Sequence, residues 1–222
     1  MNENSGVIGT KVGMTQIFTE EGLVRRVTVV EAKPFLMAKR TLEKDGYSAL
    51  VLGIGERKEK HTNKAQQGEA KKAGTTPKRI IREIRVTPEV AAKHEVGQAV
   101  SLTDVFEEGQ FVDVQGVTRG RGFTGVMRRW NFSGFPATHG THEYRRHGGS
   151  IGTNMTPGRT LPGLKMPGQY GNETVTTLNL KIAKIVAEDG LLLIEGSIPG
   201  SKNGTVVIRG AVKKKRAGKK KA

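Results

Sequence analysis

A glycine-rich stretch in the middle of the sequence contains two spacings known from enzymes. Gly120, Gly122 and Gly125 fit a dinucleotide-binding turn, and Ser150 stands in a G-x-S-x-G pattern like that of hydrolase nucleophiles. The first pattern needs a crossover helix after its last glycine, but too few residues follow Gly125 before the next glycine. The second needs a strand before the serine and a helix after it, where arginine-rich and proline-glycine segments stand instead. We therefore predict no catalytic residue, no cofactor and no small-molecule substrate, so the chain is not expected to be an enzyme.

Three histidines in the same stretch raise the question of a metal site. His139, His142 and His147 fall within nine positions, and neutral imidazoles are common zinc ligands. However, Arg145 and Arg146 stand between the candidates, and the chain has no cysteine to supply a thiolate. We predict no metal here, and we expect these histidines to form hydrogen bonds or stacking contacts with RNA.

The charge balance identifies the class of partner. The chain of 222 residues carries 37 lysines and arginines against 21 acidic residues, a formal charge of +16. Such an excess attracts polyanions, with nucleic acid first and an anionic membrane surface second. No apolar run approaches the ~20 residues that span a bilayer, and the start of the chain lacks a secretory signal pattern. We expect a cytoplasmic protein without a membrane partner.

The excess charge is concentrated in residues 118–170. Eight residues of this segment are basic and only Glu143 is acidic, with eleven glycines and four prolines between them. Regular structure is therefore not expected, and an unpartnered loop of this length would stay disordered. Binding to RNA removes that difficulty, because phosphates neutralise the cations and release counterions. Trp130 beside Arg128 and Arg129 fits either a core residue or an aromatic surface for a base, and the sequence leaves both readings open.

The secondary-structure elements on either side of residues 118–170 are expected to be strands. Runs rich in β-branched or alternating apolar residues, several of them separated by Asp-Gly and Asn-Gly turns, predict strands at residues 23–30, 47–52, 111–117, 174–182, 191–194 and 205–208. Short strands of this kind predict a mainly β protein, with a barrel built from both ends of the chain. Residues 55–76 are too polar for a core of their own and are expected to form a loop or a short helix, and residues 88–93 a helical turn.

The predicted domain organisation follows from these elements. Residues 1–117 and 171–212 form the barrel, with a polar insertion at about 55–95 that carries short helices. Residues 118–170 form an extended loop that penetrates RNA, and residues 213–222 form a basic tail.

Several motifs in one order resemble a known family. They are KVGMTQIF from Lys11, RGF from Arg121, RWNF from Arg129, ATHG from Ala137, GSIG from Gly149, TPG from Thr156 and KMPGQYGN from Lys165. In this order and spacing the chain resembles the bacterial large-subunit ribosomal protein L-three family, from about Val7 to Val212. The resemblance implies a six-stranded β-barrel and a structural constituent of the large ribosomal subunit. It also implies direct binding to large-subunit rRNA, early action in assembly, contacts with neighbouring ribosomal proteins, and a central loop that positions RNA near the peptidyl-transferase centre.

The resemblance also suggests site residues. Gly148 to Gly158 would form the innermost loop, and the arginines around it would hold RNA backbone. Met155 stands where some bacterial relatives carry a methylated glutamine, so we expect no such methylation here. The full set of predicted RNA-binding residues is Lys11, Arg119, Arg121, Arg128, Arg129, Trp130, His139, His142, Arg145, Arg146, His147, Ser150, Asn154, Met155, Arg159, Lys165, Lys213, Lys214, Lys215 and Arg216. The composition alone also allows a DNA-condensing protein, although such a protein would favour basic residues along a helix or tail.

Overall fold

The computed structural model describes residues 6–214 and shows two compact units. The first, called here the body, comprises the described residues 6–117 and 174–214. The second, called here the basic unit, comprises Thr118–Glu173. The predicted division into barrel, RNA-penetrating loop and tail as functional domains stays a prediction.

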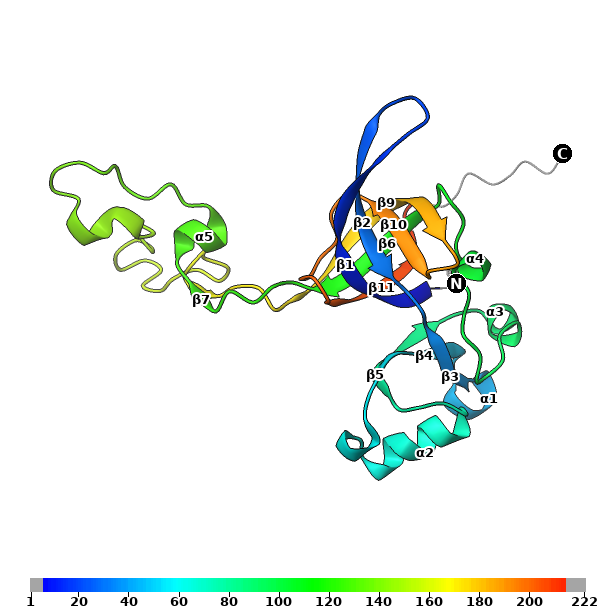
Figure 1. Cartoon of the computed structure of the whole chain (residues 1–222). Helices are drawn as coiled ribbons and strands as arrows, with labels where there is room; N and C mark the ends of the chain where they lie inside the picture. The colour runs from blue at the N-terminus through cyan, green and yellow to red at the C-terminus, as the bar shows by residue number, and fades with distance from the viewer. Residues whose placement is uncertain (1–5, 215–222) are drawn as a thin grey trace. The chain divides into compact units, whose positions relative to one another are not determined.

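A closed barrel of six strands forms the main part of the body (Figure 1). Each strand is antiparallel to both neighbours. In order around the barrel, the strands are β1 (Gly6–Phe18), β11 (Thr205–Gly210), β6 (Phe111–Val117), β9 (Thr174–Val186), β10 (Leu191–Glu195) and β2 (Val24–Glu31). The prediction of a mainly β fold with a six-stranded barrel assembled from both ends of the chain is confirmed.

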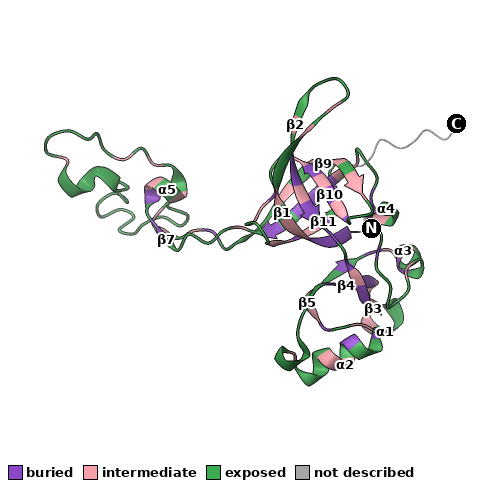
Figure 2. Cartoon of the chain, viewed as in Figure 1, coloured by how far each residue is buried: buried purple, intermediate pink, exposed green. Residues whose placement is uncertain are grey.

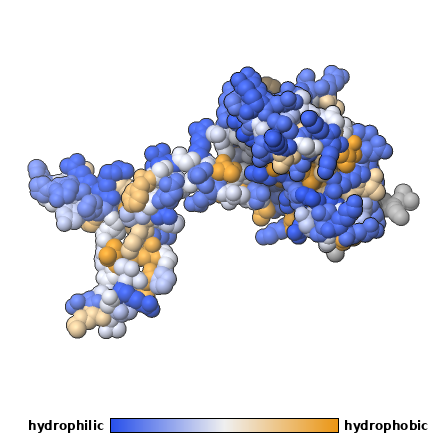
Figure 3. Space-filling view, turned by 90° about the horizontal axis from the view of Figure 1, so that it is seen from below, coloured by the Kyte–Doolittle hydropathy of each residue, from blue (hydrophilic) through white to orange (hydrophobic). Residues whose placement is uncertain are grey.

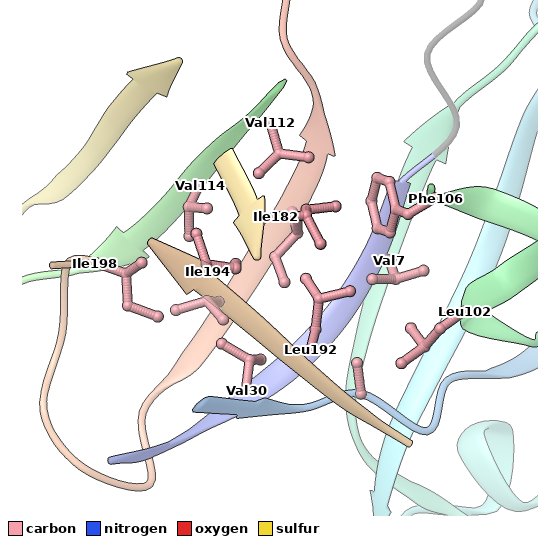
Figure 4. Close-up of a cluster of buried hydrophobic side chains, with 13 residues drawn as sticks. Val7, Val30, Leu102, Phe106, Val112, Val114, Ile182, Leu192, Ile194 and Ile198 are labelled. Atoms are coloured by element: carbon pink, nitrogen blue, oxygen red, sulfur yellow. The ribbon is translucent and has the colours of Figure 1, made fainter. Parts of the chain in front are cut away.

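The alternation of side chains along the strands builds two cores. Val7 on β1 points into the barrel, and the next residue, Ile8, packs in a second cluster on the other face of the strand. The barrel core is made of β-branched and leucine side chains closed at one place by Phe106 (Figure 4). Its buried members are Val7, Val30, Ala32, Leu102, Phe106, Val112, Val114, Ile182, Leu192, Ile194, Ile198, Val206 and Ile208.

A separate three-stranded sheet covers the second cluster. It consists of β3 (Phe35–Arg40), β4 (Ala49–Glu56) and β5 (Lys78–Arg85), with β4 in the centre. The strand predicted at residues 47–52 is therefore β4 of this sheet and not a barrel strand. Neither β3 nor β5 was predicted. In β5 only Ile84 is fully buried, and the charged residues between its isoleucines stay near the surface.

Short helices complete the body. Helix α2 (Lys64–Lys72) occupies the polar insertion and packs Ala70 with Met37 and Val51 of the sheet. The turn expected at residues 88–93 is α3 (Pro88–Ala92). The other short elements are α1 (Leu42–Asp45), η1 (Glu59–His61) and α4 (Leu102–Val105). No helix among residues 6–214 is long and apolar enough to cross a membrane.

One buried carboxylate connects three parts of the body. Asp113 on β6 accepts the backbone N–H of Asn179 at 2.8 Å and that of Val212 at 3.1 Å. Asn179 has a positive φ of 57°, in a part of β9 where the β6 register shifts. Asp113 therefore stabilises an irregular strand and fixes the position at which the chain leaves β11.

Candidate nucleic-acid interface

The basic unit begins and ends in a two-stranded ladder. Thr118 N–H donates to the carbonyl of Glu173 at 2.9 Å, and Arg121 N–H donates to that of Tyr170 at 2.8 Å. The ladder continues in β7 (Phe123–Thr124) and β8 (Gly168–Gln169), which pair antiparallel. The two ends of a long, glycine-rich segment are thus held together by backbone hydrogen bonds.

Two glycines permit close approaches that a side chain would prevent. Gly171 has a φ of 75°, and a Cβ there would overlap the carbonyl oxygen of Arg119 across the ladder. Gly134 has a φ of 73°, and a Cβ there would overlap the carbonyl oxygen of Arg145. That carbonyl accepts the N–H of Phe135 at 3.1 Å. Both positions therefore require glycine for steric and conformational reasons.

Trp130 lies within a cluster of cations. It ends helix α5 (Val126–Trp130), and its indole N–H donates to the carbonyl of Met166 at 2.8 Å. The same carbonyl accepts Nη1 of Arg129 at 2.8 Å, and the Arg129 guanidinium lies 4.9 Å from the Trp130 ring centroid. Lys165 Nζ lies 5.9 Å from the same centroid. With 38% of its surface exposed, Trp130 is partly a packing residue and partly an accessible aromatic surface.

The remaining arginines of the unit are exposed and face solvent. The Arg121 guanidinium lies over the Tyr170 ring, 4.9 Å from its centroid, and a guanidinium held on a ring can still donate its N–H groups to another acceptor. Among the described residues, no ion pair involves any cation of the basic unit, although it holds eight basic and two acidic residues. The exposed arginines are Arg119, Arg121, Arg128, Arg145, Arg146 and Arg159.

The three predicted histidines are all exposed. His142 begins the short helix η2 (His142–Arg146) with a φ of 42°, and His147 follows it, edge-on to the Tyr144 ring at 4.8 Å. Across residues 6–214, no group of three or more histidine, cysteine or acidic side chains is placed to hold a metal ion.

The predicted innermost loop is exposed along its whole length (Figure 2). Ser150 Oγ donates to the carbonyl of Gly152 at 3.0 Å, in a segment that is neither strand nor helix, so the strand–turn–helix of a nucleophile elbow is not formed here. Thr153 Oγ1 closes the next turn on the carbonyl of Thr156 at 2.8 Å. Met155 is 86% exposed and Asn154 lies beside it.

Some predicted RNA-binding residues belong to the body instead. Lys11 Nζ donates to the carbonyls of Ile198 at 2.9 Å and Gly200 at 3.3 Å, so its ammonium group holds a loop of the body. Lys213 and Lys214 are exposed, and Lys214 Nζ lies 4.1 Å from the Phe111 ring. Lys215 and Arg216 lie outside the described residues. For all of these, as for the basic unit, a role in RNA binding stays a prediction.

Sequence reasoning did not identify the residues that organise the cations. Met166 acts through its backbone carbonyl, for which the sequence gives no signal. Tyr170 supports Arg121, and an aromatic residue within this basic, glycine-rich segment was the available clue. Phe123, 79% exposed on β7, is a further aromatic surface. Figure 3 shows mostly hydrophilic surface, with small apolar patches between the charged side chains.

Fold and charge together describe a β-barrel protein with a cationic segment suited to a polyanionic partner. Residues 81–190 match the family described as Ribosomal protein L3. A protein of Sorangium cellulosum named large ribosomal subunit protein uL3 is 66% identical over 97% of this chain and 93% of its own length. Proteins of the same name from Myxococcus xanthus (51%, over 94% of this chain and 93% of the relative) and Nocardia farcinica (48%, over 94% of each) are also similar. The chain belongs to the ribosomal protein L3 family.

Proposed function

We propose that the chain, as a structural constituent of the large ribosomal subunit, binds large-subunit rRNA directly through the basic unit. In this proposal the body is the folded base from which the basic unit is held. The chain performs no chemistry; it orders RNA by neutralising phosphates and by fixing the path of the strands that it contacts. It acts early in assembly, contacts neighbouring ribosomal proteins, and positions RNA near the peptidyl-transferase centre.

The observation that carries the proposal is the set of exposed cations without ion-pair partners among the described residues of the basic unit. A protein that used these cations for its own stability would pair them with acids, as Arg25 pairs with Glu195 in the body. The exposed Arg121 guanidinium lies over the Tyr170 ring, which holds it in place while its N–H groups can still donate to phosphate oxygens. Relatives that are named large ribosomal subunit proteins support the identity of the polyanion.

The innermost loop is the segment proposed to approach the peptidyl-transferase centre. The absence of cysteine from the sequence gives a clean way to test this. Ser150→Cys, and as a control Ser201→Cys in the body, would each carry a tethered iron chelate that generates hydroxyl radicals, in chains assembled into large subunits. We expect rRNA cleavage around the peptidyl-transferase centre from position 150 and a different cleavage pattern from position 201. Cleavage from position 150 only in distant rRNA would refute the placement, and no cleavage from it would refute contact with RNA.

Met155 offers a second test at the same loop. Met155 is 86% exposed in the chain alone, and in this proposal its thioether would make an apolar contact with RNA where some relatives are expected to carry a glutamine amide. We expect Met155→Gln to leave incorporation into subunits unchanged and to alter the peptidyl-transfer rate of the assembled ribosome. A defect confined to assembly would contradict this placement.

A further inference from the structure

A cavity in the body is lined by apolar residues, one tyrosine and two arginines. Its volume is about 460 Å³, within the range of small-ligand pockets. Three chain segments line it: the turn from α1 into β4, the connection from β5 to α3, and the end of β11. The cavity lies outside the basic unit and outside the barrel core, so neither the proposed RNA interface nor the packing of the body accounts for it.

The wall of the cavity is held rigidly. The N–H of Val86 donates to the carbonyl of Ser48 at 3.2 Å, which joins the first two segments. The third segment is fixed by Asp113, whose carboxylate accepts the N–H of Val212. Leu42 and Val212 line the cavity and keep 58% and 51% of their surfaces exposed, which is unusual for apolar residues at a formed hollow. The cavity therefore offers an apolar surface that exists before any ligand binds.

An arginine lies over an aromatic ring among the lining residues. The hydroxyl of Tyr47 donates to Glu83 Oε2 at 2.8 Å, which fixes the orientation of the ring. The Arg85 guanidinium lies 4.8 Å from the centroid of that ring. A planar guanidinium held on an aromatic ring is a surface on which a nucleobase stacks.

The charge of the lining is positive. Arg85 and Arg209 both line the cavity, both are exposed, and neither forms an ion pair with another described residue. None of the described residues that line the cavity is acidic. Glu83, the acid beside Tyr47, is engaged by Arg40 and by the Tyr47 hydroxyl. The exposed Lys213 directly follows the lining residue Val212, so the positive charge continues along the chain.

We propose that this cavity binds one unpaired nucleotide of RNA, with its base against the apolar wall and the Tyr47–Arg85 stack and its phosphate at Arg209. An acidic peptide would use the two arginines but not the stacked platform, and an apolar protein side chain would use neither. The inference rests on the proposed function for the source of the RNA, since an rRNA-bound chain meets unpaired nucleotides of that RNA. The cavity would be a second RNA contact: it would bind a single nucleotide, whereas the basic unit binds the RNA backbone.

The test uses the full chain bound to large-subunit rRNA. Short-wave ultraviolet irradiation of the complex, followed by digestion and mass spectrometry, locates nucleotide adducts on peptides. We expect adducts on a cavity peptide that contains Tyr47 or Arg85, besides adducts on the basic unit. Arg85→Ala with Arg209→Ala removes the guanidinium from the Tyr47 ring and the proposed phosphate contact, and Leu42→Trp fills the hollow. Each change should reduce the cavity adduct at least about tenfold, because the loss of one stacking contact alone corresponds to about that factor. Arg79→Ala, an exposed arginine on the same strand that does not line the cavity, is the matched control and should change nothing.

The outcomes separate the two proposals. Adducts on the basic unit without any on the cavity would overturn this inference and leave the proposed function intact, whereas loss of all adducts would overturn the proposed function. A cavity adduct that persists in both altered chains would also overturn the inference, because the contact would not depend on the cavity. If irradiation of the free chain with AMP labelled the cavity while the rRNA complex gave no cavity adduct, the site would belong to a free nucleotide and the assignment to RNA would be wrong. All the altered residues are exposed, and circular dichroism of each variant confirms that it is folded.

Discussion

Arg128 and Arg129 are neighbours in sequence, but their side chains differ in exposure and in contacts. The Arg128 side chain is exposed and forms no hydrogen bond or ion pair with another described residue. Arg129 is half-buried; it donates to the Met166 carbonyl and lies over Trp130. We therefore expect Arg128→Ala to remove only a contact with RNA, and Arg129→Ala to loosen the basic unit as well.

The magnitudes differ accordingly. Each lost phosphate contact lowers the slope of log affinity against log salt by about 0.7–0.9. The ratio of the rRNA affinity of the unaltered chain to that of Arg128→Ala should therefore fall about threefold when the salt concentration rises fourfold. Arg129→Ala also loses a charge-assisted hydrogen bond and a cation–π contact, together about 1–2 kcal/mol after allowance for its partial exposure. This second loss does not depend on salt and should lower affinity further at every salt concentration.

Binding of labelled large-subunit rRNA, titrated at several salt concentrations, gives slope and intercept for each variant. The chain has a single tryptophan, so the fluorescence of Trp130 reports the local order of the basic unit without interference. We expect a changed emission for Arg129→Ala and an unchanged one for Arg128→Ala. Equal slopes, intercepts and emission for the two variants would refute the assignment of separate roles.

Three further predictions concern the body and the ladder. Asp113→Ala leaves the backbone N–H groups of Asn179 and Val212 without their acceptor and should lower the free energy of unfolding in urea by about 2–3 kcal/mol. Asp104→Ala, at an exposed position, is the control, and a loss for Asp113→Ala no larger than that of the control would contradict this prediction. Gly171→Ala should open the ladder and speed amide exchange at Arg121 and Tyr170. Gly163 also has a positive φ but has open space around it, so Gly163→Ala should not have this effect. Equal effects of the two changes would mean that backbone strain alone is responsible. The hydrogen bond to Glu83 raises the pKa of Tyr47. The stabilising effect of this hydrogen bond should therefore be complete below the ordinary tyrosine pKa and be lost as pH rises through the raised value. Titration by NMR should show a lower Tyr47 pKa in Glu83→Gln, and an unchanged pKa would remove Glu83 as the cause.

The barrel was predictable because its strands carry their own signals. The Asp-Gly turn before β10 and the Asn-Gly turn before β11 place residues with positive φ where the chain reverses, at Gly190 and Asn203. Apolar and polar residues alternate along residues 174–182, whereas β10 is a short apolar run in which every second side chain is buried.

The three-stranded sheet was less predictable because its strands do not carry such clear patterns. Strand β5 mixes lysine, arginine and glutamate with its isoleucines, because only Ile84 is fully buried. Strand β4 buries six consecutive residues, Ala49 to Ile54, and such a run does not indicate which sheet it joins. In the structure β4 pairs with β3 and β5, and its buried residues pack with Ile8 on the outer face of β1.

In the candidate interface, residue types were predictable and contacts were not. Composition identified the arginines and Trp130 as a group, but it did not distinguish Arg128 from Arg129. That distinction depends on the Met166 carbonyl, a backbone group brought into place by the β7–β8 ladder. Lys11 illustrates the converse, since its ammonium group is engaged by carbonyls of the body.

The central claim is that this chain is held in the large ribosomal subunit by direct contact with its RNA. The most direct measurement is co-sedimentation of the tagged full chain with ribosomal subunits from its own cells across a salt series. We expect recovery with the large subunit that persists at moderate salt, because contacts along the basic unit act together. Release into the unbound pool or recovery with the nucleoid at modest salt would contradict the account and favour a DNA-binding protein.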